Sequence, residues 1–108
     1  MMAEFILMYQ GGADMENMTP EEGRAHRENW MAWIKGLGEA VVNPGQPLKG
    51  NRVISGSGDR AATQAVRTSG FAIVMAPDLD AAVKIAKTDP FLALGGHIEV
   101  AEMVQMGG

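Results

Sequence analysis

Two segments of the chain are apolar at almost every position and are short enough to be strands. The first is Phe5–Tyr9, which two glycines follow, and the second is Gly70–Ala76, which a proline follows. A continuous apolar run of this length, bounded by turn-forming residues, is typical of a buried strand. Two weaker strands are predicted, one from a short apolar stretch at 40–42 and one from alternating positions over 98–103.

A helix is predicted after the first apolar run. Thr19 supplies a cap, Pro20 suits the first helical position, and Glu22 completes a capping box. The helix is expected to run to about Leu37, where flanking glycines end it.

A second helix is predicted after the second apolar run. Asp78 can cap it, and apolar residues then recur at helical spacing. Asp89 precedes Pro90, and a residue before proline avoids the helical region, so the helix is expected to end there.

The middle of the chain has weaker signals. Turn-forming residues predict a loop over 43–51, and 52–55 is predicted as a short extended piece. The glycine-rich stretch 56–59 is predicted to turn, and the polar segment 60–69 is predicted as a loop or ribbon.

The order strand, helix, strand, strand, helix, strand predicts one α+β domain over residues 1–108 with ferredoxin-like βαββαβ topology. Its antiparallel sheet would carry both helices on one face, with the two apolar strands in the centre. Central strands with one solvated face should alternate, and these two do not. We therefore expect a homodimer that covers the other sheet face. The alternative is that these apolar side chains are simply exposed.

Composition excludes several classes of function. The chain has 13 acidic and 9 basic residues, a net charge of −4, and no cysteine. This balance argues against nucleic-acid binding and against an anionic membrane surface. No signal peptide or membrane-spanning run is recognisable, so a cytoplasmic protein is predicted. Without cysteines, and with two histidines that lack metal-ligand spacing, neither a metal site nor another cofactor is predicted.

His26 is the most informative candidate for chemistry. It shares one stripe of the first helix with Trp30, Trp33 and Leu37, so it should point toward the sheet near its rim. A half-buried imidazole can act as acid or base near neutral pH. The alternative is a structural histidine hydrogen-bonded to a carbonyl or carboxylate, and the tryptophans can equally be core residues.

Asp89 is the second candidate. It could orient His26 or share a proton with it, and the alternative is a simple helix stop. His97, beside two glycines, is predicted to be solvated.

The chain resembles the YCII-related proteins, which include the DGPF-domain group. The likeness is carried by the strand 5–9, the helix start 19–22, His26 with Trp30, the loop 38–48, and the closing segment 88–100. The Asp-Gly-Pro-Phe tetrapeptide that names the subgroup is absent, and Gly58–Ala61 occupies its neighbourhood.

This resemblance implies a dimeric α/β barrel with a pocket in which His26 and Asp89 form an acid–base pair. We therefore predict His26 and Asp89 as catalytic residues. Trp30 and Trp33, together with Gly45 and Pro47 of the matching loop, are the predicted substrate-binding residues.

Three functions are compatible with this pattern. The first is a cofactor-free enzyme for an unidentified small molecule, with His26 as acid or base, Asp89 as its orienting carboxylate, and Trp30 in the pocket wall. The second is a dimer that binds a ligand without chemistry. The third is an interaction domain, which predicts a filled interface beside His26.

Overall fold

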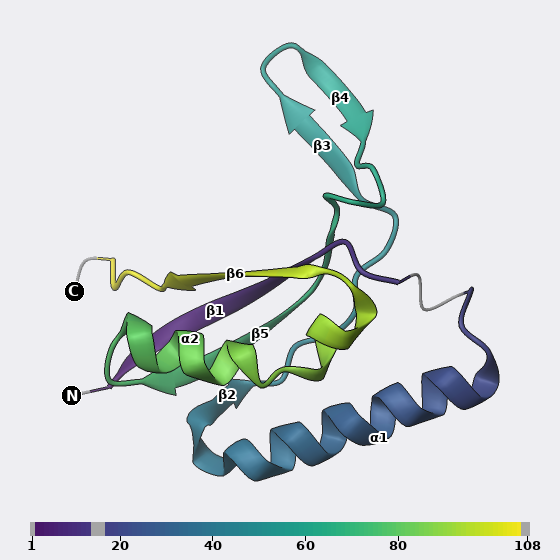
Figure 1. The fold of residues 1–108 in the computed structure, drawn as a ribbon. Coiled ribbons are helices and arrows are strands. Elements are labelled where there is room, and N and C mark those ends of the chain that lie inside the picture. The colour runs from purple at the N-terminus through teal and green to yellow at the C-terminus, as the bar shows by residue number, and fades with distance from the viewer. Residues whose placement is uncertain (1, 14–16, 107–108) are drawn as a thin grey trace.

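The computed structural model describes residues 2–13 and 17–106, and Figure 1 shows its fold. Its helices and strands follow in the order β1 Ala3–Gln10, α1 Pro20–Leu37, η2 Gly38–Ala40, β2 Val41–Asn43, β3 Arg52–Ser55, β4 Gly58–Ala61, β5 Thr68–Ala76, α2 Leu79–Lys87, η3 Pro90–Leu94 and β6 His97–Glu102, where η marks a short 3-10 helix. Four strands form one antiparallel sheet in the order β2-β5-β1-β6, and β3 and β4 form a separate hairpin.

The predicted ferredoxin-like topology is confirmed. The two apolar runs are the central strands β1 and β5, which pair with Ile6 opposite Ile73, and β2 and β6 are the edges. Burial alternates along both central strands, although their sequences do not alternate in polarity. Phe5 and Leu7 on one face are fully buried, whereas the residues between them are only partly buried.

Both helices lie on the buried face of the sheet, as predicted. Ala82 and Ala86 of α2 belong to the core cluster that contains Phe5 and Leu7. Trp30 of α1 packs against Tyr9, which lies on the same face of β1 as Leu7. In Figure 1, α2 runs along the sheet, whereas α1 stands further out.

The start of α1 confirms the capping box. The backbone N–H of Glu22 donates to Thr19 Oγ1 at 3.1 Å, and the Thr19 N–H donates to Glu22 Oε1 at 3.0 Å. Two donors at the helix start are thereby satisfied. This capping determines where α1 begins, and therefore where His26 lies along it.

The β3–β4 hairpin projects from the sheet (Figure 1). The extended piece at 52–55 is confirmed as β3, but the predicted turn over 56–59 is too long, because β4 already begins at Gly58. All eight strand residues of the hairpin are exposed, so no core imposed an apolar pattern on this part of the sequence. No helix in the described ranges is long and apolar enough to cross a membrane.

Candidate functional site

A cavity of about 880 Å³ opens where α1 stands away from the sheet. Its walls come from α1, the loop 44–51, the base of the hairpin, the first half of β5, and η3. The volume lies within the range that holds small organic ligands in proteins. An interaction domain with a filled interface beside His26 was one of the three hypotheses, and this cavity argues against it.

His26 lies on the cavity wall, half-buried on the inward stripe of α1. Burial lowers the pKa of its imidazole, and the nearby charge of Asp89 opposes this effect in part. Within the described ranges, His26 makes no hydrogen bond. The alternative, a structural histidine bonded to a carbonyl or carboxylate, is therefore not what the structure contains. A neutral imidazole facing a cavity can accept a proton from a ligand.

Asp89 is 3% exposed and caps η3. Its Oδ1 accepts the backbone N–H of Phe91 at 2.8 Å, and its Oδ2 accepts the hydroxyl of Tyr9 at 2.6 Å. Burial raises the pKa of the Asp89 carboxyl, while these two hydrogen bonds and the charge of His26 act in the opposite direction. The carboxylate therefore has a structural role whether or not it also takes part in chemistry.

Tyr9 connects Asp89 to the cavity, a role that the sequence pattern does not indicate. Tyr9 lines the cavity and Asp89 does not. No hydrogen bond or ion pair joins His26 and Asp89, both of which the structure describes, so they interact only through their charges. Burial is the larger cause that raises the pKa of the Tyr9 hydroxyl, and the hydrogen bond to Asp89 raises it further. The hydroxyl therefore stays protonated at neutral pH. The signal that could have found Tyr9 is its register with Phe5 and Leu7 at the end of a central strand.

The aromatic residues form one continuous cluster beside the cavity. The Tyr9 ring stacks on Phe91 with centroids 4.8 Å apart and meets Trp30 edge-on at 5.7 Å. Trp30 lies on the cavity wall, as the prediction of a binding role requires. Aromatic walls favour flat, largely apolar ligands.

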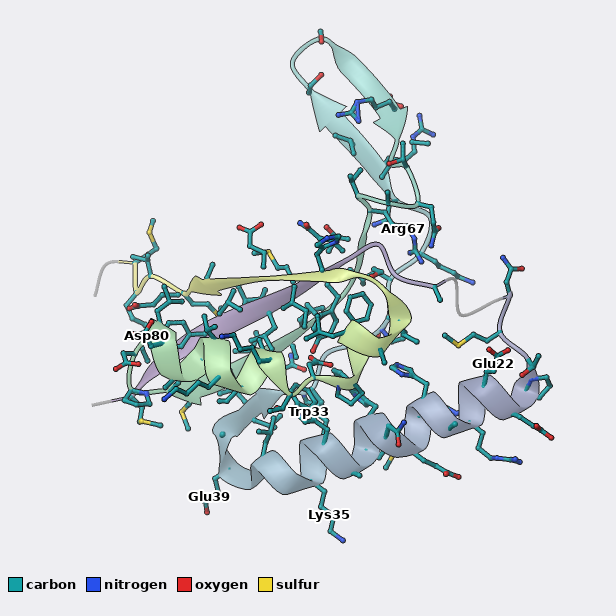
Figure 2. The ribbon with its side chains drawn as sticks, viewed as in Figure 1. Glu22, Trp33, Lys35, Glu39, Arg67 and Asp80 are labelled. Atoms are coloured by element: carbon teal, nitrogen blue, oxygen red, sulfur yellow. The ribbon has the colours of Figure 1, made fainter. Side chains whose placement is uncertain are left out.

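Trp33 lies outside the cavity, although it was predicted as a binding residue. Its ring contacts that of Trp30 at 5.1 Å, and its Nε1–H donates to Thr88 Oγ1 at 2.8 Å. Figure 2 shows Trp33 between α1 and the end of α2. Helical spacing places both tryptophans on the inward face of α1 but does not determine which of them meets the cavity.

Gly45 and Pro47 both lie on the cavity wall, in the loop that follows β2. A Cβ at Gly45 would lie 1.6 Å from the carbonyl oxygen of Phe71, and the backbone there has a φ of 74°. Both facts require glycine, because only glycine tolerates this conformation and this approach. Pro47 forms a bridge to Gly70 of β5. The loop is thus held directly against the central sheet.

Metal ligation has no visible support in residues 2–13 and 17–106. No group of three or more histidine or acidic side chains is arranged there to hold an ion.

Fold and cavity together define a ferredoxin-like α+β protein with a ligand-sized site between its first helix and its sheet. The chain belongs to the YCII-related domain family, whose model matches residues 2–107. This confirms the resemblance that the sequence analysis stated. No curated protein matches the chain.

Solved structures include a similar fold. The chain is similar to 5-chloro-2-hydroxyhydroquinone dehydrochlorinase (TftG) from Burkholderia phenoliruptrix AC1100, solved in complex with 2,5-dihydroxybenzoquinone. The similarity has a TM-score of 0.52 at 18% sequence identity and covers 95% of each chain. At this identity the likeness supports the shared fold.

Proposed function

We propose that this protein binds a small ring compound in the cavity and moves a proton on it, with His26 as the acid–base group and without a cofactor. The observation that carries the proposal is a half-buried imidazole, without a hydrogen-bond partner in the described chain, on the wall of an aromatic-lined cavity. Histidine is the side chain whose ordinary pKa lies closest to neutral pH, and burial lowers the pKa of His26, which favours the neutral imidazole that accepts a proton.

Asp89 supports His26 as a positioning residue in this proposal. Its charge stabilises the imidazolium that forms when His26 accepts a proton. Its hydrogen bond fixes Tyr9, whose ring is part of the cavity wall. The acid–base pair is therefore coupled through space, rather than joined directly as in a hydrogen-bonded dyad.

The ligand class follows from the walls and gains support from TftG. That protein was solved with 2,5-dihydroxybenzoquinone, a flat ring with hydroxyl groups. A ring of this kind suits the stacked aromatic wall formed by Tyr9, Trp30 and Phe91. It provides a probe whose binding can be measured.

A second candidate function is ligand binding without chemistry. Asp89 favours it, because both carboxylate oxygens are already engaged by Phe91 and Tyr9. In this alternative the cavity binds the same kind of ring and His26 serves as a polar contact. Proton exchange on the bound ring separates the two candidates.

We also propose that the protein works as a homodimer through the sheet face opposite the helices. On that face Ile6 pairs with Ile73, and Met8 pairs with Phe71. All four are only partly buried within the single chain. A contiguous apolar patch on a central sheet is uncommon at the surface of a monomer. A second copy would cover it with the same side chains.

Calorimetric titration with 2,5-dihydroxybenzoquinone tests the binding site. Ala62→Trp places a large ring on the cavity wall, whereas Thr63→Trp places the same ring on the neighbouring exposed residue outside it. Wild-type protein should bind saturably, and Ala62→Trp should weaken binding by about tenfold or more because it occupies the ligand's volume. Thr63→Trp should stay close to wild type. Absence of saturable binding by the wild type, or equal effects of the two variants, would contradict the proposed site.

A further inference from the structure

The cavity wall differs in charge from the chain as a whole. The chain carries 13 acidic and 9 basic residues. Yet the described residues that line the cavity include Arg27, Lys49 and Arg67 and no aspartate or glutamate. The nearest carboxylate named above, Asp89, lies behind Tyr9 with both oxygens engaged by hydrogen bonds. A cavity lined by cations in an acidic protein attracts anions.

Arg67 is the most constrained of these cations. It precedes β5 and stands at the base of the hairpin in Figure 2. Its Nη1 donates to the carbonyl of Leu48 at 3.1 Å, and its Nε donates to Gln64 Oε1 at 3.2 Å. Arg67 is partly buried as a residue, but the hydrogen bonds of its guanidinium are exposed, and within residues 2–13 and 17–106 it has no carboxylate partner. A cation held in place by neutral acceptors on a cavity wall is prepared to pair with a charge brought by a ligand.

Asn51 helps to hold the segment that carries Arg67. Its Nδ2 donates to the carbonyl of Thr68 at 2.7 Å, next to Arg67 in the chain. Its Oδ1 is buried from solvent and has no hydrogen-bond partner in the described residues, so a ligand in the cavity does not reach it. Asn51 and Arg67 thus both tie the loop before β3 to the start of β5.

We infer that the cavity is specific for a small aromatic acid, whose anionic group pairs with Arg67. This inference rests on the proposed function in one respect, namely that the cavity is the ligand site. It adds a substrate class that the aromatic walls and His26 do not determine. The free N–H groups of the Arg67 guanidinium match the two oxygens of a carboxylate.

The test compares para-hydroxybenzoate with para-hydroxybenzamide, which has nearly the same shape but no charge. Titration calorimetry at fixed ionic strength gives both dissociation constants. Wild-type protein should bind the acid about tenfold or more tightly than the amide, because hydrogen bonds to charged groups are roughly twice as strong. Arg67→Gln should reduce this preference to near unity, and Arg67→Lys should retain part of it. Arg60→Gln, on exposed β4, should leave it unchanged.

Melting temperatures measured on every variant separate lost recognition from lost folding, since the ratio of two ligands is taken on the same protein sample.

Several results would overturn the inference. They are equal binding of acid and amide by the wild type, an unchanged preference in both Arg67 variants, or no binding of the acid at millimolar concentration. If the acid fails while 2,5-dihydroxybenzoquinone binds and exchanges protons, the proposed function stands and the acid specificity alone is wrong. If the acid binds as expected but no ring exchanges protons, the acid specificity stands and the proposed proton transfer is wrong.

Discussion

Replacing His26 with glutamine is expected to slow proton exchange on a bound ring by about 100-fold or more, the usual contribution of a positioned acid–base group. In deuterium oxide, the ring hydrogens of 2,5-dihydroxybenzoquinone can exchange when a ring carbon accepts a deuteron from the imidazolium and then returns a proton to the neutral imidazole. The loss of the ring proton signal measures the rate. Glutamine has a similar size but cannot exchange a proton at neutral pH.

The matched control is His97→Gln. His97 is exposed on β6 and is not part of the cavity wall, so its replacement should leave the exchange rate unchanged. The catalytic role of His26 would be contradicted by equal rates in the wild type and His26→Gln. If His26→Gln instead lowers the melting temperature and loses ligand binding to the same extent, the residue is structural. If wild-type protein binds the ring without accelerating exchange, the non-catalytic alternative is the better account.

Ile73→Lys is expected to convert the protein from a dimer to a monomer. Ile73 lies in the middle of the outer sheet face, opposite Ile6. In a symmetric interface one substitution places two ammonium groups in the apolar contact, and burying unpaired charges costs several kcal/mol or more. In the monomer the lysine reaches solvent, so the fold should persist. Light scattering of the variant should then give a mass near 11.5 kDa.

Leu79→Lys is the control for this result. Leu79 is 48% exposed at the start of α2, on the helix side of the sheet, so its charge should leave the dimer intact. The dimer proposal would be wrong if dilute wild-type protein itself had the mass of one chain. It would also be wrong if Leu79→Lys dissociated the protein as readily as Ile73→Lys.

The fold could be predicted from the sequence because its signals are local and agree with one another. The capping residues Thr19 and Glu22 determine the start of α1, and two apolar runs identify the central strands. The hairpin was only partly predicted, because its exposed strands carry no pattern that a core would impose.

The candidate site was predicted in part, for a physical reason. Helical spacing places His26 and Trp30 on one stripe, and the structure shows both at the cavity. The bond between Tyr9 and Asp89 joins residues 80 positions apart, which no periodicity can reveal. Arg67 follows a segment without regular structure, so its direction depends on contacts with Leu48 and Gln64 that only the folded chain defines.

The most direct test is NMR of the two imidazole rings during titration with 2,5-dihydroxybenzoquinone. The account predicts that ligand binding shifts the ring nitrogen signals of His26 toward those of the protonated form, while the signals of His97 stay in place. Saturation of the protein with no change at His26, or with equal changes at both rings, would contradict the claim that His26 exchanges a proton with a molecule held in this cavity.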